Sequence, residues 1–195
     1  METLVVVDIQ PAYAEKWPHV NKVMQTINNH HGNIILFVNE ELTNDTMEEI
    51  KLWWLDHGLE ERILDTAIIN DKGYGVLRDW MDSGIDTDTI IETLQYMQKN
   101  NIYITEDIDT SDPNLSDSII EAIESDCGHI HSYFIDDDII KTISDNYLIC
   151  GGSKHECLAE VEIYLASQNK KAIQIDHLIY DGDYSCKKQK TYAYY

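Results

Sequence analysis

Basic residues are scarce in this chain. Its 195 residues include 14 lysines and arginines against 36 aspartates and glutamates, a formal net charge of −22, and arginine occurs only at Arg62 and Arg78. A protein that binds nucleic acid through phosphates needs a basic surface, so we expect no nucleic-acid partner. Such an acidic surface suits either a very soluble protein or one that attracts a basic protein partner.

Long apolar stretches are also missing. The longest ones, such as residues 3–9 and 33–38, are far shorter than the roughly 20 residues of a membrane span. No basic segment precedes the first of them, as it would in a signal peptide. We therefore expect a cytoplasmic protein with no membrane partner. The many Ile, Asn, Asp and Tyr residues, and the use of Lys in place of Arg, suit an AT-rich genome and hint at a viral source, in which case the compartment is the host cytoplasm.

Metal-ligand spacings are lacking as well. The sequence contains no CxxC motif and no Cys/His cluster of the zinc type. We expect no metal and no cofactor, and free thiols in the cytosol. The four cysteines are Cys127, Cys150, Cys157 and Cys186.

Apolar segments and amphipathic segments alternate along the whole chain. This alternation predicts a single α/β domain over residues 1–195, a three-layer α/β/α sandwich with a mainly parallel, doubly wound sheet. In such sheets the ligand site lies beyond the carboxyl ends of the strands. The predicted strands are residues 3–8, 33–39, 101–105, 129–134, 147–151 and 171–177, with a short one near 66–70.

Two residues with chemical potential follow predicted strands. Asp8 ends the first strand, and Cys157 lies just after the strand at 147–151. Ser153 and Glu156 have the spacing of a capping box, which places Cys157 in the first turn of a helix. The N–H groups and the dipole of that turn favour a thiolate.

Asp8 is then a candidate base for the Cys157 thiol. Gly151 and Gly152 allow the backbone to approach a ligand closely. The alternative is that Cys157 is a small core residue, because cysteine is among the most buried residue types. Spacing alone favours the core interpretation.

Two segments resemble the isochorismatase-like cysteine hydrolases, the superfamily of nicotinamidases and related amidohydrolases. "VVVDIQPAY" at 5–13 resembles the first strand of that family and its Asp. "LICGGSKHECLAEVEIYLASQNKKAIQIDHLI" at 148–179 resembles the strand, Gly, five residues, nucleophilic Cys, helix and strand. "SYFIDDDIIKTI" at 132–143 resembles an aromatic-ended strand and its following helix.

The resemblance implies an isochorismatase-like fold and a triad of Asp, Lys and Cys. Asp8 would activate the thiol, and Cys157 would attack the carbon of a small amide or another C–N bond. A cis peptide would precede Ser153. The N–H groups of Ser153 and Cys157 would form the oxyanion hole.

The chain also departs from the family pattern. The family Lys lies six residues before the position of Phe134, which is Gly128 here, and no Lys occurs between Lys99 and Lys141. Candidate substitute cations are His129, His131 and Lys154. The metal signature of nicotinamidases is missing after the second strand, and residues 42–100 do not resemble the family core. We interpret 42–100 as an insertion over the site or as the surface of a homo-oligomer.

Two hypotheses of function therefore remain. The first is a divergent cysteine hydrolase that acts on a small-molecule substrate. The second is a non-catalytic relative whose acidic surface binds a basic protein, such as a viral DNA mimic or inhibitor. The missing Lys favours the second, and the retained Asp8 and Cys157 favour the first.

Overall fold

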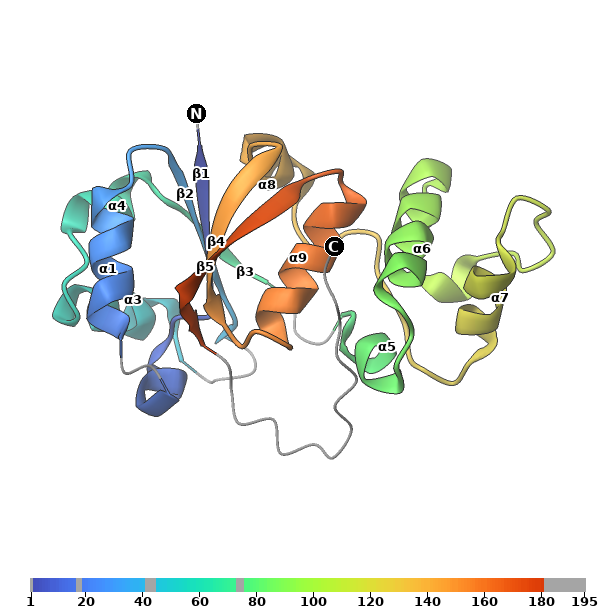
Figure 1. The fold of residues 1–195 in the computed structure, drawn as a ribbon, viewed down its shortest axis with the longest axis horizontal. Helices are drawn as coiled ribbons and strands as arrows, with labels where there is room; N and C mark the ends of the chain where they lie inside the picture. The colour runs from blue at the N-terminus through green and yellow to red at the C-terminus, as the bar shows by residue number, and fades with distance from the viewer. Residues whose placement is uncertain (1, 17–18, 41–44, 73–75, 181–195) are drawn as a thin grey trace.

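The fold is built on one five-stranded sheet (Figure 1). A computed structural model of the chain describes residues 2–16, 19–40, 45–72 and 76–180. All neighbouring strands are parallel, in the order β3-β2-β1-β4-β5. The α/β class and the parallel sheet predicted from the sequence are thus confirmed. The strands are β1 (Thr3–Val7), β2 (Asn33–Val38), β3 (Ile68–Asp71), β4 (Asn146–Gly152) and β5 (Lys171–Tyr180).

Strand β1 lies at the centre of the sheet and is buried along its whole length. It pairs with β2 and β4, and Val7 lies opposite both Phe37 and Gly151. Because side chains alternate along a strand, Val5 and Val7 enter one core and Leu4 and Val6 enter the other. A continuous apolar run is what a strand covered on both faces requires.

Helices cover both faces of this sheet (Figure 1). On one face, α1, α3 and α4 enclose the core that contains Leu4 and Val6. On the other, α5, α6, α8 and α9 enclose the core that contains Val5 and Val7, and α7 packs against α6. The helices are α1 (Val20–Asn29), α3 (Met47–Asp56), α4 (Glu61–Thr66), α5 (Arg78–Ser83), α6 (Thr87–Asn100), α7 (Asp117–Glu124), α8 (Asp137–Thr142) and α9 (Cys157–Ser167), with 3-10 turns η1 (Pro11–Lys16) and η2 (Thr105–Asp107).

Two of the predicted strands are wrong. Residues 101–105 and 129–134 form no strand of the sheet and meet in one antiparallel bridge, between Ile104 and His131. The second of these segments contacts helix α9 through Phe134 and the Ser132 carbonyl. The Phe134 ring lies 5.4 Å from the Tyr164 ring, and Tyr164 donates a hydrogen bond of 2.8 Å to the Ser132 carbonyl.

The range 42–100, predicted to be an insertion, contributes to both cores. Its helices α3 and α4 lie on one face, its helices α5 and α6 lie on the other, and its strand β3 pairs with β2 at one edge of the sheet. Trp54 and Trp80, both within this range, are buried. Helix α6 is capped by Asp86, which accepts the Thr89 N–H at 2.9 Å.

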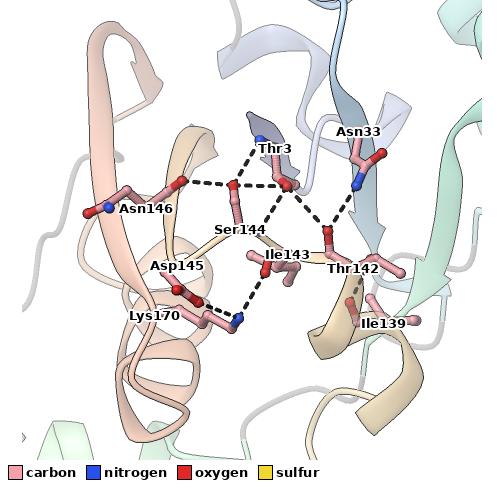
Figure 2. A network of polar contacts seen from close by, with 9 residues as sticks. All are labelled: Thr3, Asn33, Ile139, Thr142, Ile143, Ser144, Asp145, Asn146 and Lys170. Carbon is pink, nitrogen blue, oxygen red and sulfur yellow. Dashed lines mark hydrogen bonds and ion pairs between the residues drawn. The ribbon is translucent and has the colours of Figure 1, made fainter. Parts of the chain in front are cut away.

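Polar contacts close the amino end of the sheet (Figure 2). Thr3 and Ser144 exchange hydrogen bonds through their backbone N–H and hydroxyl groups, each 3.0 Å long. Asn33 donates to the Thr142 carbonyl at 2.9 Å, and Lys170 binds the Ile143 carbonyl at 2.9 Å. These bonds tie the entries of β1, β2 and β4 together, at the end of the strands opposite to Asp8.

Candidate functional site

Three chemically capable side chains meet at the carboxyl edge of the sheet. Asp8 directly follows β1, Lys72 directly follows β3, and Cys157 begins α9 after the turn that leaves β4. The backbone N–H of Asp8 donates to Phe37 at 2.9 Å, and that of Lys72 donates to Val38 at 2.9 Å. Sheet-like hydrogen bonding therefore continues past the strand ends and fixes where both side chains begin.

Asp8 and Lys72 form a buried ion pair. Lys72 Nζ lies 3.1 Å from Asp8 Oδ2, and the two side chains are 0 % and 1 % exposed. Burial raises the pKa of the Asp8 carboxyl, and the Lys72 charge opposes this rise. Burial also works against the Lys72 ammonium, but the charges of Asp8, Cys157 and Glu160 outweigh it and raise the pKa of Lys72. Lys72 therefore stays cationic, and its charge favours the ionised form of Asp8 against the effect of burial.

The Cys157 thiol is the third member of this group. It is buried and lies close enough to the Asp8 carboxylate for each group to shift the pKa of the other. Burial, followed by the negative charge of Asp8, raises the pKa of Cys157 to about 12. The resting thiol thus keeps its proton and lies near a carboxylate, which is the arrangement of a nucleophile with a candidate base.

A second cation lies on the other side of the thiol. Arg78 Nη2 is 3.8 Å from Cys157 Sγ and 3.2 Å from Glu160 Oε2. Its Nη1 is 3.5 Å from the Glu156 carboxylate. Glu160 is fully buried and also accepts the Leu77 N–H at 3.2 Å. The start of α5 and the first turn of α9 are therefore joined through charged side chains around Cys157.

The turn before α9 differs in part from expectation. The peptide between Gly152 and Ser153 is cis, as the family resemblance predicts. The predicted capping box is wrong, because Glu156 is the N-cap and makes no capping bond through its side chain. Its carboxylate reaches Arg78 instead, and the Ser153 carbonyl accepts from Glu156 and Leu158 at 3.0 and 3.1 Å.

The backbone N–H groups of Ser153 and Cys157 flank this turn. Among the described residues, no backbone acceptor is found for the N–H groups of Ser153 and Cys157. These are the two groups that the resemblance assigns to an oxyanion hole. Helix α9 begins at Cys157, so the positive end of its dipole also lies here.

Gly151 and Gly152 serve the packing of the sheet. A Cβ on Gly151, whose φ is +114°, would lie 2.1 Å from the Val7 carbonyl oxygen. A Cβ on Gly152 would lie 2.8 Å from the Tyr180 side chain. The space that a ligand was expected to need is thus taken by neighbouring strands β1 and β5.

The predicted substitute cations have other contacts. His129 is exposed and lies 3.1 Å from Glu106, and the His131 ring packs 6.2 Å from Tyr133. Lys154 donates its backbone N–H to Tyr180 at 2.8 Å. In the described part of the chain, none of these three side chains has a recorded contact with Asp8 or Cys157.

Gly128, the position expected from the family spacing of the Lys, packs on α5. Its carbonyl accepts the Trp80 indole N–H at 3.2 Å, and a Cβ there would lie 2.6 Å from the Asp79 carboxylate. The cation beside Asp8 comes instead from Lys72, 56 positions earlier in the numbering.

Sequence reasoning missed Lys72, Arg78 and Glu160. Two polar residues, Asn70 and Asp71, separate Lys72 from the short apolar run at 67–69, so Lys72 lacks the signal that singled out Asp8. Glu160 is a charged residue within the apolar stretch of α9, where every residue from 157 to 165 is buried. A charge buried in such a helix needs a buried partner of opposite charge. Arg78 is one of only two arginines in the chain, so few residues could be that partner through a guanidinium.

The structure and the comparisons add two findings. Within the described ranges no helix is long and apolar enough to cross a membrane, and no group of three or more His, Cys, Asp or Glu residues is arranged to hold a metal ion. Neither the models of known families, nor the curated proteins, nor the solved structures gave a match to this chain.

Proposed function

We propose that the protein is a cysteine hydrolase of the isochorismatase-like kind that cleaves a small amide or a related C–N bond. The observation that carries this proposal is the convergence of Asp8, Lys72 and Cys157 at one edge of the sheet. The Asp–Lys–Cys set implied by the sequence resemblance is complete once Lys72 is included. The three-layer isochorismatase-like architecture is part of the same proposal.

The chemistry starts with a proton transfer. Asp8 accepts the thiol proton as the Cys157 sulfur attacks the carbonyl carbon, so that a C–S bond forms and the carbonyl oxygen becomes negative. Lys72 holds Asp8 ionised before the transfer, because it is the buried counter-ion of that carboxylate. Since a buried thiol with a raised pKa is a poor nucleophile by itself, this base is essential to the scheme.

The tetrahedral intermediate then collapses. The N–H groups of Ser153 and Cys157 are the proposed donors to its oxyanion, and each such donor commonly contributes about 10²–10³ in rate. Asp8 returns its proton to the departing nitrogen as the C–N bond breaks, which leaves a thioester on Cys157. Water, deprotonated by the same carboxylate, hydrolyses the thioester and restores the thiol.

Release of ammonia or amine from a panel of small amides tests the proposal. The panel contains neutral, anionic and cationic amides, and the variants are Cys157→Ala, Lys72→Met and the matched control Cys127→Ala, which removes another buried free thiol. We expect turnover in wild type and in the control, and a loss of about 10³-fold or more in the two site variants, because the members of such a set act as a unit. Turnover that survives Cys157→Ala would refute the proposal.

A second candidate is a binding role, favoured by the net charge of −22. Attraction between exposed charges is screened within about 10 Å at 0.1 M salt. A complex with a basic protein should therefore dissociate as salt is raised towards 1 M. The absence of turnover across the panel, together with salt-sensitive binding of that kind, would favour this role over hydrolysis.

A further inference from the structure

We infer that Arg78 is a second catalytic cation of the site, which Glu160 holds against the Cys157 sulfur so that it stabilises the thiolate. The inference deepens the proposed hydrolase function and rests on it for its catalytic meaning. In this scheme the two cations have separate tasks. Lys72 is the counter-ion of the base, and Arg78 is the counter-ion of the nucleophile.

The geometry gives Arg78 direct access to the sulfur. Its Nη2 lies 3.8 Å from Cys157 Sγ, a distance suited to a hydrogen bond from nitrogen to sulfur, and its side chain is only 11 % exposed. An opposite charge this close favours the ionised form of a group, and the effect grows when water is excluded. The positive charge of Arg78 therefore acts where negative charge appears when the thiol proton leaves.

Glu160 explains why the guanidinium stays at this place. Cys157 and Glu160 are three residues apart on α9 and so share one face of the helix. The Glu160 carboxylate binds Arg78 through one oxygen at 3.2 Å and the Leu77 N–H through the other at 3.2 Å. It thus fixes both the head of Arg78 and the backbone just before it, which makes Glu160 a positioning residue.

The charges around the thiol come from four parts of the fold. Asp8 follows β1 and Lys72 follows β3, Arg78 lies on α5, and Glu156 and Glu160 belong to the start of α9. Among these charges, Asp8 raises the pKa of Cys157, whereas Lys72 and Arg78 lower it. Removing Arg78 leaves the thiolate facing an excess of carboxylates.

Alkylation of Cys157 by iodoacetamide tests this role without any substrate. In that reaction the sulfur forms a bond to carbon and iodide leaves, so the rate reports the thiolate. The variants are Arg78→Gln, which keeps hydrogen-bond donors for Glu160, Arg78→Lys, which keeps a positive charge, and Arg62→Gln as control. Arg62 is the only other arginine and is exposed. Peptide mass spectrometry follows Cys157, and unlabelled Cys150, which is fully buried, reports an intact fold.

We expect Arg78→Gln to slow Cys157 alkylation about 3- to 10-fold at pH 8. This follows from a thiol pKa about 1–2 units higher, of which roughly half is offset by the greater nucleophilicity of a more basic thiolate. The pH profile of labelling should move to higher pH. Arg78→Lys should fall between Arg78→Gln and wild type, because an ammonium cannot span Glu160 and the sulfur at once, and Arg62→Gln should match wild type.

Equal labelling of folded Arg78→Gln and wild type across pH would overturn the inference. If Cys150 becomes labelled in Arg78→Gln, that variant is misfolded and Arg78→Lys is used in its place. Labelling of Cys157 in Arg78→Lys equal to that in wild type at every pH would then also overturn the inference. The result is separate from the fate of the proposed function. If Arg78→Gln slows labelling but no amide is turned over, the thiolate role of Arg78 is supported and the hydrolase function is refuted. If amides are turned over but Arg78→Gln labels like wild type, the hydrolase function is supported and the role of Arg78 is refuted.

Discussion

Lys72 Nζ lies 3.1 Å from Asp8 Oδ2, and neither side chain reaches solvent. Two strands that are not neighbours in the sheet, β1 and β3, deliver these residues, and β2 lies between them. A charge buried this deeply is costly unless it is paired. The pair is therefore an obligate unit, in which the loss of one member leaves the other as an uncompensated charge.

Lys72→Met should destabilise the protein strongly. The substitution keeps an apolar stem of similar length but leaves the buried Asp8 without its counter-ion, and breaking a buried pair in this way costs about 3–5 kcal/mol. The midpoint of urea unfolding at pH 7 measures the loss. Lys141→Met is the matched control, because Lys141 pairs with Asp138 on the exposed surface and its loss should leave the midpoint unchanged. Equal midpoints for the two variants would contradict the prediction.

Glu162 should make stability depend on pH. Glu162 lies in α9, and Gln174 of strand β5 donates hydrogen bonds to both of its carboxylate oxygens, at 2.9 and 3.0 Å. Burial raises the pKa of Glu162 to about 7. The folded state then binds a proton that the unfolded state has released, so this group lowers stability as pH rises from about 4.5 to about 7. The loss amounts to at most about 3.5 kcal/mol, from about 1.4 kcal/mol per pKa unit.

Glu162→Gln tests this assignment. The amide keeps the contact with Gln174 but does not titrate, so the variant should be more stable than wild type at pH 8 and equal to it near pH 4. Urea unfolding at both pH values measures the difference between the two proteins, in which the contributions of the other carboxylates cancel. A constant difference across this range would show that Glu162 does not titrate there.

Gly151→Ala should prevent stable folding. The new Cβ would lie 2.1 Å from the Val7 carbonyl oxygen and 2.6 Å from the Val7 nitrogen, both of which are backbone atoms at the centre of the sheet. Steric overpacking and an unfavourable φ each cost about 1–3 kcal/mol. Gly58→Ala separates the two effects, since Gly58 has a φ of +93° and open space around it. Thermal unfolding should show a much larger loss for Gly151→Ala, and similar losses would refute the steric explanation.

The positions of Asp8 and Cys157 at the edge of the sheet could be predicted from the sequence, because each depends on the pattern of its neighbouring residues. A continuous apolar run marks a strand buried on both faces, and the residue after it must lie at the carboxyl edge of a parallel sheet. The helix that begins at Cys157 follows from the glycine turn and the apolar stretch after it. These signals need no knowledge of which strands are neighbours.

Lys72 could not be predicted in the same way, because its role depends on pairing between distant segments. The strand before it has four residues, all partly exposed or exposed, so its pattern is weak. Residues 129–134 have the stronger alternation, but they join no strand of the sheet and contact helix α9 instead. An alternating pattern shows which side chains are buried, whereas the order of the strands decides which of them meet.

Mass spectrometry of the protein during turnover tests the proposed triad most directly. Wild-type protein is mixed with each amide of the panel, quenched in acid within seconds, and digested to locate any acyl group. We predict an acyl adduct on Cys157 with the amide that releases ammonia or amine, and no adduct on Cys127 or Cys150. Asp8→Asn should abolish the adduct, because the thiol then has no base. Turnover without an adduct on Cys157, or an undiminished adduct in Asp8→Asn, would contradict the triad of Asp8, Lys72 and Cys157.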